Sequence, residues 1–147
     1  MLDVSVRTGI LQLFKRLQQE RDLSMLYISH DLSTINYLTD RTMIMYLGNI
    51  VEQGPTEQMI HNSAHSYTEA LLDSVPDPDP RRNREQSRLE GDVPDPVDLP
   101  AGCRFRPKCD YATEECRESE PELEPIGVVM DDRDPREAAY YHSVNTE

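Results

Sequence analysis

The chain has 147 residues, a mass of 16.9 kDa and a formal net charge of −13, from 28 acidic and 15 basic residues. This charge argues against nucleic acid or an anionic membrane as a general partner. No apolar run reaches the roughly 20 residues of a transmembrane helix, and residues 1–4 lack a signal-peptide pattern, so we expect a cytoplasmic protein. The acidic, lysine-poor composition suits a high-salt cytoplasm, although an ordinary acidic tail gives the same count.

The composition divides the chain into three parts. Residues 1–75 hold nearly all of the apolar periodicity, residues 76–100 are rich in Pro and Asp, and residues 101–147 contain all three cysteines. Repeated X-Pro steps disfavour helix, and the middle part has almost no apolar residues. It is therefore predicted to be an extended linker between two structured parts.

The first three predicted elements follow one another closely. Apolar residues recur at helical spacing over residues 5–21, which predicts an amphipathic helix. Residues 24–29 form a nearly continuous apolar run, the pattern of a strand buried on both faces. A short helix is predicted over residues 32–38.

A hairpin is predicted next. Residues 41–46 read as a strand, the Gly-Asn pair at 48–49 is a two-residue turn signal, and residues 50–53 return as the partner strand. The Gly-Pro pair at 54–55 is expected to end that strand.

Two short helices complete the first part. Thr56 is expected to cap the first of them. Residues 66–69 have the Ser-x-x-Glu pattern of a capping box, which opens a helix carrying the apolar residues 70–72.

This order of elements predicts an α/β fold, but one that begins at a helix with no strand before it. Residues 1–75 therefore resemble the trailing part of a sheet whose leading strands are missing. Alone, they would expose the strand edge of residues 25–28 and one face of the first helix. We expect poor solubility, partial unfolding or association.

Two polar segments could carry chemistry. Ser29, His30 and Asp31 stand where the predicted buried strand ends, and ligands of open α/β sheets bind at such ends. His30 could donate a hydrogen bond to a phosphate or orient a water, or it could simply cap a helix, with Asp31 as the helix's N-terminal charge. Asp3, just before the first helix, reads on its own as an N-cap.

Taken together, these segments resemble the end of an ABC-transporter ATPase domain. Residues 2–3 resemble the D-loop, and residues 29–31 resemble the switch region. Residues 65–76 look like the His-Pro-Tyr-Thr-x-x-Leu-Leu stretch of the oligopeptide/dipeptide import subfamily, with Ser66 where Pro is usual. Residues 102–109 are similar to that subfamily's C-terminal extension.

The resemblance implies a fold, ligands and partners. Residues 1–75 would be the C-terminal part of the ATPase domain, and residues 101–147 the irregular, cysteine-containing extension. His30 would contact the γ-phosphate of ATP bound with Mg²⁺, and Asp3 would lie at the contact with a second ATPase subunit. Membrane permease subunits would hold the protein at the inner face of the cell membrane.

The sequence lacks the phosphate loop that such an ATPase needs. No G-x-x-x-x-G-K-[ST] motif occurs in the 147 residues. The subfamily's Gln loop, signature segment and Walker B carboxylates would lie upstream of Met1, which could be an internal methionine of a longer protein. We expect that this chain alone neither binds ATP tightly nor hydrolyses it.

The cysteines suggest a metal site. Cys103, Cys109 and Cys116 could converge on one zinc ion or a [4Fe–4S] cluster. In the resembling subfamily some members have a fourth Cys near the C-terminus. Tyr141 aligns with it here, and His142 could serve instead. The alternative is three free thiols or small buried hydrophobes.

Three functions remain open at this stage. The first is the C-terminal part of an ATPase subunit that powers the import of oligopeptides or dipeptides. The second is a non-catalytic remnant that acts as an interaction or regulatory protein. The third is an independent iron–sulfur or zinc protein.

Overall fold

The computed structural model describes residues 4–75, 99–126 and 135–142 of the chain. Its contacts divide into two compact units, Met1–Asp40 and Arg41–Glu147, here called the first unit and the second unit. The predicted boundaries at residues 75 and 100 come from the composition and remain a prediction, and residues 76–98 of the predicted linker lie outside the described residues.

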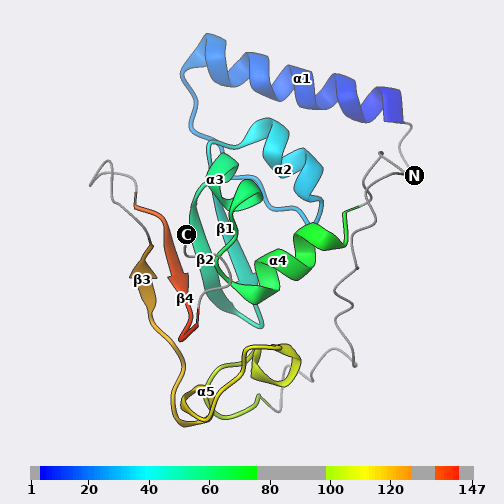
Figure 1. Cartoon of the computed structure of the whole chain (residues 1–147). Coiled ribbons are helices and arrows are strands. Elements are labelled where there is room, and N and C mark those ends of the chain that lie inside the picture. Colours follow the sequence, from blue (N-terminus) through cyan, green and yellow to red (C-terminus); the bar gives the residue numbers. More distant parts are fainter. Residues whose placement is uncertain (1–3, 76–98, 127–134, 143–147) are drawn as a thin grey trace. The chain divides into compact units, whose positions relative to one another are not determined.

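The first unit contains two helices, α1 (Val4–Arg21) and α2 (Leu32–Leu38), both as predicted (Figure 1). Asp22 ends α1 in the left-handed region, with φ of 51°, and the N–H of Leu23 donates to the carbonyl oxygen of Gln18 at 3.2 Å. A helix that ends this way has its last carbonyl groups satisfied before the chain turns away.

The predicted strand over residues 24–29 is wrong. This stretch is not a strand, and Leu26 and Ile28 are 82% and 89% exposed. A strand needs a hydrogen-bonded neighbour, and the described part of the first unit contains no strand at all. The expected exposure of apolar groups is confirmed, because Val6, Ile10 and Leu13 of α1 are exposed too.

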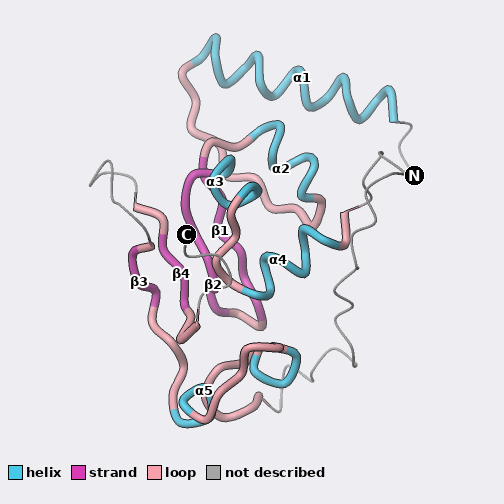
Figure 2. Tube along the Cα trace, in the orientation of Figure 1, coloured by secondary structure: helices cyan, strands magenta, loops and turns pink. Residues whose placement is uncertain are grey.

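The second unit is built on an antiparallel hairpin of β1 (Arg41–Tyr46) and β2 (Asn49–Pro55), as Figure 2 shows. The turn lies one residue earlier than predicted, at Leu47 and Gly48, whose φ angles are 46° and 89°. Positive φ at both positions matches the right-handed twist of the strands, and Asn49 already pairs with Tyr46.

Two helices lie against this hairpin, α3 (Thr56–His61) and α4 (Ser66–Asp73) (Figure 1). Both predicted caps are wrong. The hydroxyl of Thr56 pairs with that of Thr42 at 2.8 Å, and α3 has no side-chain cap. Helix α4 is capped by His65, whose Nδ1 accepts a hydrogen bond from the N–H of Tyr67 at 3.0 Å, and not by Ser66.

The cysteine-containing part belongs to the same unit. After the 3-10 turn η1 (Arg106–Lys108) and α5 (Glu115–Glu118), strands β3 (Leu123–Pro125) and β4 (Glu137–Ala139) extend the sheet in the order β1-β2-β4-β3. The described region is thus a mixed fold of helices and antiparallel sheet. The extension, which is predicted to be irregular, also contributes two three-residue strands, β3 and β4, to the hairpin's sheet.

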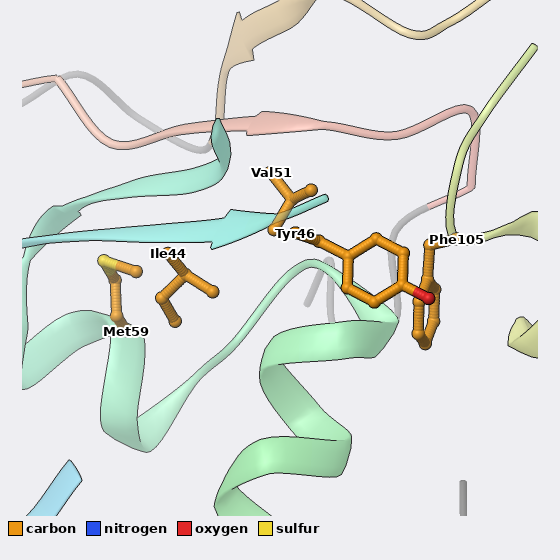
Figure 3. Close-up of a cluster of buried hydrophobic side chains, with 5 residues drawn as sticks. All are labelled: Ile44, Tyr46, Val51, Met59 and Phe105. Atoms are coloured by element: carbon orange, nitrogen blue, oxygen red, sulfur yellow. The ribbon is translucent and has the colours of Figure 1, made fainter. Parts of the chain in front are cut away.

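The core of the second unit joins the hairpin, α3 and the extension. Figure 3 shows its five buried side chains: Ile44, Tyr46, Val51, Met59 and Phe105. Phe105 is 2% exposed and meets Tyr46 edge-on, with ring centroids 5.2 Å apart. Burying one such ring stabilises the fold by about 2–3 kcal/mol, so Phe105 anchors the extension to the hairpin.

A buried ion pair connects β2 to the residue that precedes β4. The carboxylate of Glu52 on β2 is fully buried and accepts from Arg136 Nη2 at 2.8 Å. It also accepts from the N–H groups of Ala64 and His65, each at 3.1 Å, and Arg136 donates further to the carbonyl oxygen of Asn62. A buried charge needs this full set of partners, and the pair connects residues 84 positions apart.

Candidate functional site

The candidate site in the first unit is the turn between α1 and α2, which carries the Ser29-His30-Asp31 segment. Asp31 is the N-cap of α2: its Oδ1 accepts from the N–H groups of Ser33 and Thr34 at 3.0 and 3.4 Å. In turn, the N–H of Asp31 donates to the Ser29 hydroxyl at 3.0 Å. The residues on both sides of His30 are therefore fixed by local hydrogen bonds.

A side chain from α1 adds to this arrangement. Arg7 forms an ion pair with Asp31 through Nη2 and Oδ2, and the same Nη2 donates to the Thr34 hydroxyl at 2.7 Å. The Thr34 hydroxyl also donates to Asp31 Oδ2 at 3.0 Å. This triad of Arg7, Asp31 and Thr34 ties the turn to α1.

The electrostatics agree with this geometry. Burial by itself would raise the pKa of Asp31, but the hydrogen bonds from Thr34 and the hydrogen bond and charge of Arg7 outweigh it, so the pKa is lowered from 3.8. Asp31 is therefore a carboxylate at neutral pH. Asp31 itself is the N-cap, so the cap lies one residue later than the predicted His30, and Asp31 also supplies the predicted negative charge at the start of α2.

His30 itself stays outside this network. It is exposed, and within the part of the chain that the structure describes its ring makes no hydrogen bond. An exposed imidazole on a turn fixed at both neighbours can reach a ligand brought from outside. The predicted contact with a phosphate stays a prediction. Asp3, the other predicted interface residue, lies outside the described residues.

The predicted metal ligands lie in the second unit, where two cysteines pack against its core. Cys103 and Cys109 are half-buried beside the core cluster, and the Cys109 thiol lies 3.3 Å from the Ser66 hydroxyl. Burial raises the pKa of Cys103, and the neighbouring thiols of Cys116 and Cys109 add to the increase, although backbone hydrogen bonds oppose it. At neutral pH Cys103 is a thiol.

The other two predicted ligands meet through Thr113. The sulfur of the buried Cys116 lies 3.6 Å from the Thr113 hydroxyl, and His142 Nε2 lies 3.2 Å from that same hydroxyl. Tyr141, at the position where relatives could carry a fourth Cys, pairs its hydroxyl with Ser119. Thr113 thus stands between the imidazole and the thiol.

These four side chains do not form a ligand set. Across residues 4–75, 99–126 and 135–142, no group of three His, Cys, Asp or Glu side chains is arranged to hold a metal ion. The iron–sulfur or zinc expectation is therefore not supported. The packing of Cys103 and Cys109 on the core instead matches the alternative of small buried hydrophobes.

Sequence reasoning missed Arg7 and Thr34. Arg7 contacts Asp31 from 24 positions away, and no local pattern signals such a pair. Thr34 could have been found, because a threonine three residues after an N-cap Asp can return a hydroxyl to that carboxylate.

The chain matches one known family over residues 51–116, described as "Oligopeptide/dipeptide transporter, C-terminal region". This region runs from β2 through α4 to Cys116. It does not include His30.

Several curated proteins are similar over most of the chain. The dipeptide transport ATP-binding protein DppF of Haemophilus influenzae is 49% identical over 123 residues, which cover 84% of this chain and 38% of DppF. The oligopeptide transport ATP-binding protein OppF of Salmonella typhimurium is 43% identical over 125 residues, which cover 84% of this chain and 37% of OppF. A probable peptide ABC transporter ATP-binding protein of Sinorhizobium fredii is 43% identical and covers 95% of this chain, 40% of its own length.

The chain thus spans about two fifths of the length of these curated relatives. No helix in the described ranges is long and apolar enough to cross a bilayer. Neither a stand-alone regulatory remnant nor an independent metalloprotein finds support in these similarities.

Proposed function

Because the chain belongs to the oligopeptide/dipeptide transport ATP-binding proteins and matches their C-terminal part, we propose that it supplies the C-terminal portion of an ATPase subunit that couples ATP hydrolysis to peptide uptake. The observation that carries this proposal is the exposed His30 on a turn fixed by Ser29, Asp31 and Arg7. In this role the His30 imidazole donates a hydrogen bond to the γ-phosphate as charge develops there.

Most of the catalytic groups would come from outside this sequence. The 147 residues contain no phosphate-loop motif, and the described ones contain no cluster of carboxylates that fits Mg²⁺. No chemical step on this chain is therefore assigned to the metal. The chain's own contribution is to position His30 against a nucleotide held by the rest of the ATPase domain.

The proposed partners follow from the same role. Asp3 would lie at the contact with a second ATPase subunit, and permease subunits would hold the assembly at the inner face of the cell membrane.

The test joins this chain to the upstream part of a relative. A fusion of the remaining N-terminal portion of H. influenzae DppF with residues 1–147 is assayed for ATP hydrolysis together with its permeases. We expect His30→Ala to lower kcat about 100-fold or more with little change in KM, because the interaction forms mainly in the transition state.

The matched control is His61→Ala, which removes another exposed histidine at the end of α3. It should leave kcat unchanged. The 147-residue chain alone should show no ATP turnover. A fusion whose His30→Ala variant keeps the parental rate, or turnover by the isolated chain, would contradict the proposal.

A further inference from the structure

A small cavity, partly open to solvent, lies in the second unit where the end of β1, the start of α4 and the extension meet. Its volume is about 30 Å³. The side chains and backbone that line it include Tyr46, His65, Cys103, Phe105 and Ala139. One water molecule needs about 10–15 Å³ of such space, so the cavity has room for at least one water but is too small for a nucleotide or a peptide.

The first polar group at this cavity is the Tyr46 hydroxyl. Tyr46 is 9% exposed, and its hydroxyl is buried without a hydrogen-bond partner among the described residues. A buried hydroxyl left in this state costs about 1–3 kcal/mol. Burial raises the pKa of Tyr46, and nearby Tyr67 and Cys103 raise it further. Cys103 lines the same cavity.

The second polar group is the His65 ring, which is 5% exposed. Its Nδ1 accepts the N–H of Tyr67 at 3.0 Å, so the proton of the neutral ring must be on Nε2. Burial lowers the pKa of His65 to about 4, despite the opposing charge of Glu52, so the ring is neutral at pH 7. The ring lines the cavity, and Nε2–H is the hydrogen-bonding group that it has left once Nδ1 is taken.

We propose that this cavity binds an ordered water molecule, which accepts a hydrogen bond from His65 Nε2–H and pairs with the Tyr46 hydroxyl. The Cys103 thiol supplies a weaker third partner. A bound water of this kind typically makes about three hydrogen bonds, and Tyr46, His65 and Cys103 together offer that number. The water would connect β1, the start of α4 and the extension, three segments that Phe105 already joins by apolar contact (Figure 3).

The test compares two tyrosine variants of the 147-residue chain by denaturant unfolding. If the water is present, Tyr46→Phe removes one of its partners, and the unfolding equilibrium constant should rise about fivefold. The control is Tyr67→Phe in the same aromatic cluster. The ring centroid of Tyr67 lies 4.7 Å from that of Tyr46, but its hydroxyl is not among the buried groups that lack a hydrogen-bond partner. It should change the constant by less than twofold.

A direct readout uses nuclear magnetic resonance. A long-lived water should give a nuclear Overhauser cross-peak to the His65 Nε2 proton, absent in His65→Asn, which can still cap α4. If Tyr46→Phe leaves the unfolding constant unchanged or lowers it, the hydroxyl has no water as a hydrogen-bond partner and the proposal is overturned. Absence of the cross-peak in the parent chain overturns it as well.

Discussion

The two units of this chain hold their residues in place by different means. In the second unit, side chains far apart in sequence meet in a closed interior: Phe105 packs on Tyr46, and Glu52 pairs with Arg136. In the first unit, the turn before α2 is held mainly by hydrogen bonds of Asp31, while Leu26 and Ile28 lie in solvent. A segment can thus have well-defined local geometry without burying its apolar residues.

This difference bears directly on the proposed role. The second unit has the contacts of a self-sufficient core, whereas the first unit carries the residue proposed to meet the nucleotide. A turn that presents a side chain to an external ligand gains from local rigidity. The exposed apolar side chains of Leu26 and Ile28 beside it are available to pack against another part of a protein. The comparison can be tested by variants that act on one unit and spare the other.

The largest effect is expected from the buried ion pair. Glu52→Ala leaves Arg136 buried without its partner and should lower the free energy of unfolding of the second unit by about 3–5 kcal/mol. Urea denaturation followed by tyrosine fluorescence measures it. The exposed pair Arg117–Glu114 is the control: Arg117→Ala should cost less than about 1 kcal/mol. Equal losses in the two variants would contradict the assigned burial.

A pH effect of similar size is expected from His65. Its folded pKa of about 4 lies below the ordinary 6.5, so the folded state binds fewer protons between these values. The free energy of unfolding should therefore fall by about 3 kcal/mol as the pH drops from 6.5 to 4, with no further loss from this group below that.

The matched variant for this titration is His65→Asn. Asparagine can cap α4 but does not titrate, so its stability should depend less steeply on pH in this window. Denaturation at several pH values gives both slopes. Parallel pH curves for the two proteins would show that His65 is not buried as described.

A smaller, local effect is expected in the first unit. Asp31→Ala removes the N-cap of α2 and should lower its local stability by about 1 kcal/mol, seen as faster hydrogen exchange of the Ser33 and Thr34 amides. Because the pKa of Asp31 is lowered, the same protection should be lost in the parent chain as the pH falls below about 3.8. Exchange in β2 should not change; a response there would show that the two units are energetically coupled.

The smallest effect on stability is expected at the exposed apolar run. Leu26→Ser and Ile28→Ser remove groups that are already in solvent and should change the free energy of unfolding by less than about 0.5 kcal/mol. They should nevertheless reduce self-association, measured by sedimentation velocity. A large loss of stability in these variants would mean that the two side chains are buried in solution.

Local periodicity was enough to predict α1, α2 and β1, because each has its signal within its own residues. The apolar run at residues 24–29 shows why prediction from local patterns fails elsewhere. Such a run indicates that its side chains are to be buried, but it does not indicate which part of a protein buries them. Strands β3 and β4 have three residues each, too few for any alternation to be visible.

The site was predictable in part for the same reason. Asp31 as a helix cap follows from its position next to α2, whereas its partner Arg7 lies a whole helix away. The displacement of the α4 cap from Ser66 to His65 is a matter of one residue: an imidazole nitrogen one position earlier already accepts the amide of Tyr67. Patterns built on Ser, Thr, Asp and Asn do not consider histidine for this place.

The span between Glu52 and Arg136 has a consequence for synthesis on the ribosome. Glu52 is synthesised 84 residues before the guanidinium that neutralises it. Until then, the carboxylate cannot be buried without a large penalty, so the hairpin's inner face has to stay hydrated. We therefore expect the second unit to close only after Arg136 has been synthesised, and chains that stop before residue 136 to be degraded rather than to accumulate.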